Sequence, residues 1–177
     1  MRQFALDIET TGLEPSAGHR VIEAGLIEIV DGSITNFHYH QYYNPGRPLD
    51  PEVANFVEKT DKFLATCPNF MEEGRSLLNI IDGHELIIHK ASFDVGFLNN
   101  QIRLTMPNDI LLEQRCKITD TLPLARKLHP GQKCNLRALM ERYGINMRIY
   151  EDVYQGALYD AAAIAEIYLA MITIGNE

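Results

Sequence analysis

The segment F-A-L-D-I-E-T-T-G, residues 4–12, begins the predicted fold and carries its first functional residues. Residues 3–8 are predicted as a β-strand, with Asp7 and Glu9 in or just after it. Because strand side chains alternate, we expect both carboxylates on one face and Ile8 on the other, in the core. Neighbouring carboxylates repel each other unless a cation lies between them. The pair is therefore a candidate site for Mg²⁺ or Mn²⁺, which prefer oxygen ligands. For D-x-E alone, two solvated acids at a strand edge are the commoner explanation.

The rest of the chain predicts two blocks of secondary structure. Residues 20–30 and 34–43, separated by the tight turn Asp31-Gly32-Ser33, form an antiparallel meander with the first strand. After a segment with three prolines, helices are predicted at 70–81, 92–104, 120–128, 135–143 and 157–172, and strands at 85–89 and 116–119. A meander followed by alternating strands and helices is typical of an α/β fold with a mixed sheet packed by helices.

Composition and charge narrow the class of protein. A chain of 177 residues with 46% hydrophobic residues is long and apolar enough for one domain with a substantial core. Its net charge of −8 argues against a general nucleic-acid coat. Residues 101–150 nevertheless hold nine Lys/Arg against four Asp/Glu, whereas the remainder holds seven against twenty. This basic region suits contact with a few phosphates, although ordinary solvated helix faces explain the charge equally well.

The chain is expected in the cytoplasm. Its N-terminus, M-R-Q-F-A-L-D, lacks a signal-peptide pattern, and no apolar run approaches the length of a membrane span. The three cysteines are an odd number at unrelated spacings, which suits a reducing compartment and matches no zinc pattern.

Two further acids differ in how easily a structural role explains them. Asp94 is expected near the start of a helix, two residues after a Ser92 N-cap, where interaction with the helix dipole accounts for it. Asp160 lies in the apolar stretch 156–172, whose only other charge is Glu166. A helix that apolar is mostly buried, and a buried carboxylate needs a partner or a metal. Glu166 is expected to be the solvated exception.

Taken together, these acids lie in three motifs with a fixed order. D-I-E-T-T-G begins at Asp7, H-K-A-S-F-D-V-G-F covers 89–97 and Y-Q-G-A-L-Y-D-A-A covers 154–162. The chain resembles the DnaQ-like (DEDD) 3′→5′ exonucleases, and within them the proofreading (epsilon) subunits of bacterial DNA polymerase III. The segments V-I-E-A-G, C-K-I-T-D-T-L-P-L-A-R-K-L-H-P-G and N-L-R-A-L-M-E-R-Y-G-I extend the likeness to about residues 3–172.

The resemblance implies a fold, a reaction and its cofactors. The fold is ribonuclease H-like, α/β, with a mixed five-stranded sheet and helices on both sides, in a single exonuclease domain over residues 1–177. The reaction is removal of nucleotides from a single-stranded DNA 3′ end. Two Mg²⁺ or Mn²⁺ ions activate water and stabilise the leaving 3′ oxygen in such sites. The residues that match their ligands are Asp7, Glu9, Asp94 and Asp160.

Substrate contacts and partners are implied in the same way. Thr10, Gly12 and Leu13 match positions that shape the pocket for the terminal nucleotide, and Phe93 matches an apolar wall. His89 matches a histidine before the second motif, although we favour a hydrogen-bonded structural histidine there. The implied partner is a DNA polymerase catalytic subunit, with no membrane.

The pattern breaks at the general base. One branch of the family has His five residues before the last Asp, and another has Tyr four before it, whereas this chain has Gln155 and Gly156. Glutamine cannot accept a proton from water but can orient it by hydrogen bonding. The family's loop before residue 61 usually carries a histidine, and residues 53–61 contain none.

Three interpretations of Gln155 follow. The chain is an exonuclease of reduced or altered metal-dependent activity, a catalytically silent module that binds DNA ends or a polymerase, or an inactivated variant of an active enzyme. A further alternative keeps the enzyme and changes the substrate to short RNA, with tolerance of the 2′-OH as the discriminating property. Release of mononucleotides with Mn²⁺ separates the enzyme from the binding module.

Overall fold

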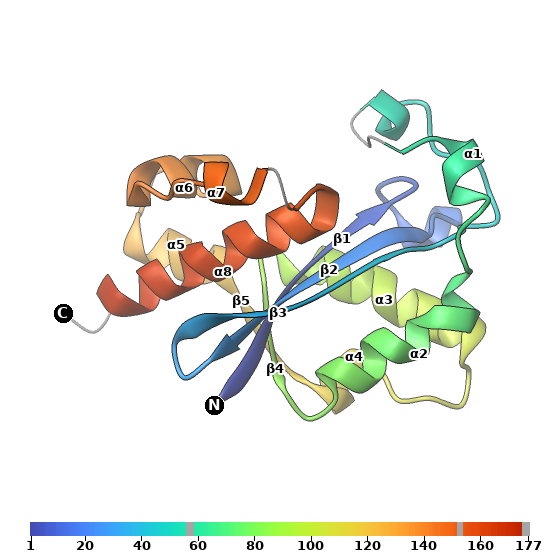
Figure 1. Cartoon of the computed structure of the whole chain (residues 1–177), viewed down its shortest axis with the longest axis horizontal. Coiled ribbons are helices and arrows are strands. Elements are labelled where there is room, and N and C mark those ends of the chain that lie inside the picture. The colour runs from blue at the N-terminus through green and yellow to red at the C-terminus, as the bar shows by residue number, and fades with distance from the viewer. Residues whose placement is uncertain (56–58, 152–153, 175–177) are drawn as a thin grey trace.

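The computed structural model describes residues 1–55, 59–151 and 154–174, which are built around one five-stranded sheet (Figure 1). The strands are β1 Arg2–Thr10, β2 Val21–Val30, β3 Ser33–Tyr42, β4 Glu85–Ile88 and β5 Lys117–Asp120. They lie in the order β3-β2-β1-β4-β5. β2 pairs antiparallel with β1 and β3, whereas β4 pairs parallel with β1 and β5. The predicted mixed five-stranded sheet is therefore confirmed.

The helices largely follow the prediction. They are α1 Asp61–Leu64, α2 Phe70–Ile81, α3 Ala91–Thr105, α4 Leu112–Arg115, α5 Thr121–Leu128, α6 Leu136–Tyr143, α7 Arg148–Glu151 and α8 Gly156–Ile174, with 3-10 turns η1 Pro15–Ala17 and η2 Val53–Asn55. The turns and the four-residue helices α1, α4 and α7 were not predicted, because one turn is too short to display a helical period. α2 begins at a capping box in which Asn69 and Glu72 exchange side-chain and backbone hydrogen bonds.

Alternation along β1 divides the core into two layers. Phe4, Leu6 and Ile8 pack in a cluster with side chains of α2, α3 and α4. Ala5 faces the other way, into a cluster built largely from α8. In Figure 1, α8 with α5–α7 covers one face of the sheet and α2–α4 the other. Helices on both sides, and Ile8 opposite the two acids, are as predicted.

The start of α3 differs from the prediction. The helix begins at Ala91, and its N-cap is Lys90 in a left-handed conformation (φ 66°), so the expected Ser92 cap is wrong. The Asp120 carboxylate accepts hydrogen bonds from the N–H groups of Lys90 (2.9 Å) and Ala91 (3.1 Å). It also accepts one from Leu122 N–H at 2.9 Å and thereby caps α5. One carboxylate therefore satisfies orphan amides at the start of two helices.

α8 is more apolar than the sequence analysis allowed for. Its most apolar 18-residue window has a mean hydropathy of 1.6, so its length and composition would suit a membrane span. Half of that window is buried inside the protein, where α8 packs mainly on β1 and β2. This is the environment of a core helix. Glu166, expected to be solvated, accepts a hydrogen bond from the Tyr150 hydroxyl at 2.8 Å.

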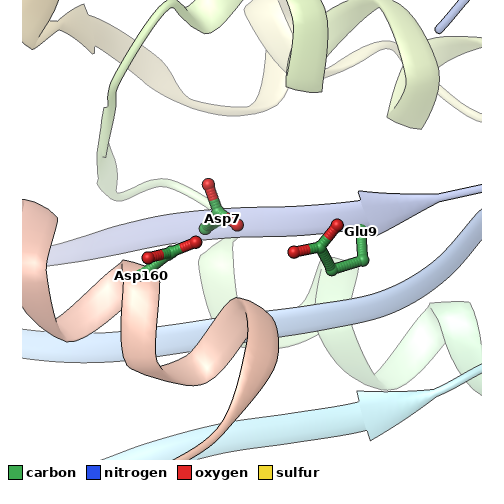
Figure 2. A group of neighbouring side chains, drawn as sticks. All are labelled: Asp7, Glu9 and Asp160. Atoms are coloured by element: carbon green, nitrogen blue, oxygen red, sulfur yellow. The ribbon is translucent and has the colours of Figure 1, made fainter. Parts of the chain in front are cut away.

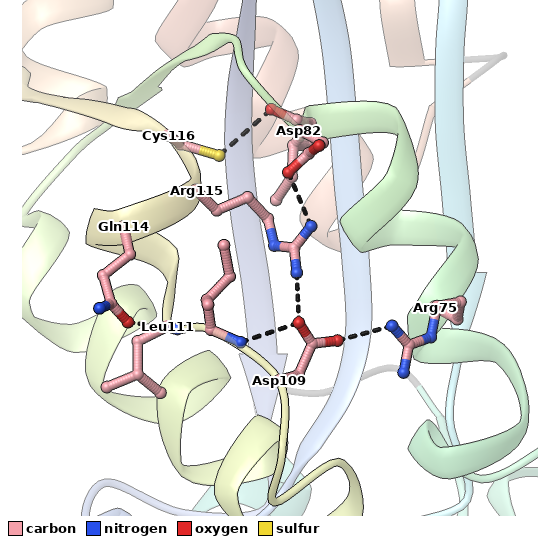
Figure 3. A network of polar contacts seen from close by, with 9 residues as sticks. Arg75, Asp82, Asp109, Leu111, Gln114, Arg115 and Cys116 are labelled. Atoms are coloured by element: carbon pink, nitrogen blue, oxygen red, sulfur yellow. Dashed lines mark hydrogen bonds and ion pairs between the residues drawn. The ribbon is translucent and has the colours of Figure 1, made fainter.

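A charged network braces the other helical layer (Figure 3). Arg115, at the end of α4, donates to Asp82 (2.7 Å), just after α2, and to Asp109 (2.6 Å). Asp109 also accepts from Arg75 of α2 at 2.6 Å. The Arg115 and Asp109 side chains are 9% and 13% exposed, so their ion pair is screened less than a surface pair. The network ties α2 to the segment that leads into β5.

Candidate active site

Three carboxylates from two elements meet on the α8 face of the sheet (Figure 2). Asp7 and Glu9 project from β1, and Asp160 projects toward them from the early part of α8. One oxygen from each residue lies within 4.8 Å of the others. The predicted alternation of Asp7, Ile8 and Glu9 is what brings the two strand acids to this face.

Burial and mutual repulsion disfavour the charged forms of these acids. Burial, followed by the charges of Asp94, Asp160 and other nearby acids, raises the pKa of Asp7 well above its ordinary value. Burial and the charges of Glu23 and Asp160 raise the pKa of Glu9 to about 7. The pKa of Asp160 is raised by burial and by Glu23. These carboxylates are hard oxygen donors whose mutual repulsion a divalent cation would relieve, so the donor set fits Mg²⁺ or Mn²⁺.

Asp94 approaches from the opposite layer. It lies in the first turn of α3 and is 3% exposed. Burial raises its pKa to about 8, against the hydrogen bonds that its carboxylate accepts from the N–H groups of Ile8 and of Asp94 itself. β4 pairs with β1 only as far as Ala5, so Ile8 lies beyond the parallel ladder. Asp94 is thus beside Asp7 but outside the three-carboxylate group of Figure 2.

The loop after β1 separates two cavities. One, of about 300 Å³, is lined by Gly12, Leu13, Glu14, Ala17, His19, Asp50, Glu52 and Val53. The other, of about 360 Å³, is lined by Leu13, Glu14, Pro15, Lys90, Ser92, Phe93, Gly96 and Phe97. Leu13 is 69% exposed and belongs to both walls. Of the predicted substrate residues, Gly12 and Leu13 therefore line the first cavity, and Leu13 and Phe93 line the second.

Local contacts fix the shape of this loop. The Thr10 hydroxyl donates to the carbonyl of Gly12 at 2.6 Å. A Cβ at Gly12 would lie 2.2 Å from the His19 ring, so residue 12 must be glycine for the ring to pack there. His19 Nδ1 lies 3.1 Å from the Thr11 hydroxyl. His19 was not among the predicted site residues, because nothing in the sequence around it distinguishes it.

His89 lies between β4 and the segment that leads into α6. Its Nδ1 is 2.8 Å from the Thr121 hydroxyl, and it hydrogen-bonds the backbone of Cys134. Burial lowers its pKa, despite the opposing effect of the Cys134 bond. Both contacts support the structural role favoured from sequence.

Gln155 and Tyr154 immediately precede α8, and Gln155 is exposed. Asp160 follows five residues later, so Gln155 lies just before the helix that carries one acid of the cluster. Residues 56–58, in the loop where the resemblance predicts a histidine, lie outside the described residues.

Glu23 was not among the predicted site residues. This residue of β2 lies directly opposite Glu9 in the antiparallel register and is 2% exposed. Its Oε1 accepts hydrogen bonds from His40 Nε2 (2.7 Å) and from the backbone N–H of Ala157 (3.0 Å). The available signal was an acid within the apolar run V-I-E-A-G-L-I, because a glutamate buried in a central strand requires partners.

The mixed five-stranded sheet with helices on both sides has the ribonuclease H-like fold, and comparison with known proteins identifies the family. The family model described as Exonuclease (RNase_T) matches residues 4–168. The DNA polymerase III subunit epsilon of Haemophilus influenzae is 40% identical over 174 residues, which cover 96% of this chain and 67% of the relative. The subunit epsilon of Escherichia coli is 39% identical over 174 residues, covering 96% and 71%. The chain belongs to the exonuclease family.

Solved structures share the fold at lower identity. Exonuclease X in complex with 5′-overhanging duplex DNA has a TM-score of 0.75 at 22% identity, covering 99% of this chain and 93% of that one. A 3′-exonuclease solved with a histone mRNA stem-loop has a TM-score of 0.78 at 18% identity, covering 98% and 64%. Family and relatives together support a 3′→5′ exonuclease of the proofreading type. Exonucleases of this family generally use divalent metal ions.

Proposed function

We propose that residues 1–177 act as one exonuclease domain that hydrolyses phosphodiester bonds at single-stranded DNA 3′ ends and releases mononucleotides. The observation that carries this proposal is the meeting of Asp7, Glu9 and Asp160 within 4.8 Å. Two Mg²⁺ or Mn²⁺ ions would be held by these residues and Asp94. When bound, such ions promote ionisation of water and stabilise charge on a departing oxygen.

The two cavities at the loop after β1, the strand that carries Asp7 and Glu9, suit the end of a nucleic-acid strand. Leu13 separates them, so its exposed side chain is placed to lie between two successive nucleotides. Thr10 and Gly12 shape the first cavity, and Phe93 gives the second an apolar wall. Apolar and aromatic walls favour stacking of a base, and stacking tolerates any base sequence. His89 is too engaged with Thr121 and Cys134 to be a principal substrate contact.

Gln155 makes this a slow enzyme in our proposal. Its amide can orient a water molecule by hydrogen bonding but cannot take a proton from it. Loss of a general base costs about 10²–10⁴-fold in rate. The same substitution supports a second candidate function, in which the site binds DNA 3′ ends or a polymerase without turnover.

The polymerase and the cellular location are proposed from the relatives. Proteins about 40% identical to this chain are DNA polymerase III subunits. We therefore propose a polymerase catalytic subunit as partner, at work in the cytoplasm.

The test is degradation of a single-stranded DNA labelled at its 5′ end, with Mn²⁺ and with EDTA. The proposal expects stepwise shortening from the 3′ end, mononucleotide release and abolition by EDTA. The matched control is Asp160→Asn, which keeps the side-chain shape and removes the charge. Tight binding of 3′ ends without release, in both proteins, would instead support the binding module. Faster shortening of an RNA of the same sequence would support the short-RNA alternative.

A further inference from the structure

The start of α8 rests on a buried acid–histidine pair. Glu23 Oε1 accepts from the N–H of Ala157, one of the first-turn amides that a helix cannot satisfy internally. The same oxygen accepts from His40 Nε2, on the neighbouring strand β3. The Glu23 side chain is 2% exposed and that of His40 is 24% exposed. The pair thus joins β2, β3 and the first turn of α8.

Two glycines allow this close approach. A Cβ at Gly156 would lie 2.4 Å from Glu23 Oε1, so the backbone just after Gln155 lies directly on the carboxylate. A Cβ at Gly25 would lie 2.5 Å from the Leu158 backbone, so strand and helix touch without a side chain between them. A side chain at residue 25 would push the helix off the strand, and one at residue 156 would displace the Glu23 carboxylate.

The contact lies at the register of the catalytic acids. In the β1–β2 pair, Glu23 is opposite Glu9 and Gly25 is opposite Asp7. The two β2 positions that hold the first turn of α8 are therefore the cross-strand neighbours of the two β1 acids. Any shift of that turn moves residue 155 and Asp160 relative to Asp7 and Glu9.

A carboxylate at this place needs a partner of its own, because it is one more acid among acids. Glu23 adds negative charge beside Asp7, Glu9 and Asp160, and its charge raises the pKa of each of them. Retaining a charge here is unfavourable unless it is paired. His40 supplies the partner, and the carboxylate accepts from both the ring and the helix amide.

We propose that Glu23 and His40 form a positioning pair that sets residue 155 and Asp160 against the β1 acids. This inference rests on the proposed exonuclease function. Neither residue is assigned a contact with substrate. Their effect passes through the first turn of α8.

The test is a double-mutant cycle between Glu23→Ala and Gln155→His, with kcat and KM measured on single-stranded DNA with Mn²⁺. A histidine at 155 should raise kcat by about 10²-fold in the parent. Coupled residues give non-additive effects. In the Glu23→Ala background, the increase in kcat caused by Gln155→His should fall below about tenfold. Glu23→Ala should change KM by less than about twofold. Glu23→Gln keeps a carbonyl for the Ala157 amide and should restore most of the gain.

The matched control is Glu28→Ala. Glu28 is also a buried glutamate of β2, 8% exposed and paired with Arg2, but it lies at the other end of the strand. The Glu28→Ala variant should be less stable, but the increase in kcat caused by Gln155→His should be unchanged in it. A full gain in folded Glu23→Ala, or an equal loss with Glu28→Ala, would overturn the proposal.

A readout independent of catalysis separates this proposal from the exonuclease function. Amide hydrogen exchange at Ala157 should be slow in the parent and in Glu28→Ala, and at least about tenfold faster in Glu23→Ala, because its acceptor is gone. If Gln155→His does not raise kcat in the parent, residue 155 is not the position of a general base. The exchange rate of the Ala157 amide then still tests whether Glu23 positions the first turn of α8. If Glu23→Ala does not fold, His40→Gln replaces it and should reduce the gain several-fold. Unchanged exchange or an undiminished gain overturns the pair.

Discussion

Glu9 and Glu23 face each other across the β1–β2 pair, so two carboxylates occupy directly opposed positions. Like charges at such positions are destabilising. Glu23 has His40 and the Ala157 amide as partners, whereas Glu9 has neighbouring acids, and its pKa rises to about 7 through burial and the charge of Glu23. Repulsion among these carboxylates therefore destabilises the site, and a bound divalent cation would relieve that repulsion.

The metal-free protein should lose stability as pH rises. In the folded state Glu9 titrates at about 7 and Asp94 at about 8, against ordinary values of 4.5 and 3.8. Between those values the folded protein binds more protons than the unfolded chain, so the free energy of unfolding falls with rising pH. Urea titrations in EDTA at pH 5.5 and 8 should give the lower midpoint at pH 8.

Mn²⁺ should reverse this trend, because it binds the ionised acids. Its stabilising effect should be small at pH 5.5 and several degrees at pH 8, measured as the shift in Tm with millimolar Mn²⁺. Equal shifts at both values would contradict the pKa directions. No shift at either value, in folded protein, would count against the metal site itself.

Removing a single acid should separate stability from activity. Asp7→Asn keeps the side-chain shape and removes a carboxyl whose ionised form is disfavoured by burial and by like charges, so the metal-free Tm should rise at alkaline pH. Residual nuclease activity should fall by about 10³-fold, since metal stabilisation of transition-state charge contributes several kcal/mol. Mn²⁺ should also stabilise the variant less. A variant with lower metal-free Tm and unchanged turnover would contradict the assigned role.

Asp120→Ala tests whether the metal ligands are limited to the four assigned acids. The motifs assign Asp120 no metal role, and its carboxylate caps α3 and α5. Loss of a capping side chain costs about 0.5–2 kcal/mol, so two caps predict a clear fall in the urea midpoint. Folded protein should still bind Mn²⁺ and retain activity within several-fold. Damage as severe as that of Asp7→Ala in folded protein would mean that the four assigned ligands are wrong.

The sequence predicts the parts of the site that follow from local periodicity. The alternation of Asp7, Ile8 and Glu9 and the apolar surroundings of Asp160 both predict where these side chains point. Long-range partners were not foreseeable. The left-handed Lys90 cap depends on Asp120, thirty residues away along the chain. Glu23 depends on His40 and on an amide 134 residues away. An acid in an apolar strand signals that a partner exists without identifying it.

Gln155→His should supply the general base that the resemblance predicts at this position. The first turn of α8 is held in place by Glu23, so a histidine at 155 would enter a preorganised backbone. Digestion of single-stranded DNA from the 3′ end should rise by about 10²-fold or more. The gain should increase with pH through the ordinary histidine pKa of about 6.5, because only the neutral ring accepts a proton. The parent and Gln155→Ala should both lack that titration. If metal and DNA binding are intact and the rate does not rise, the site has diverged beyond residue 155. The histidine-free loop at 53–61 would then be the next segment to test. The binding module would become the better explanation.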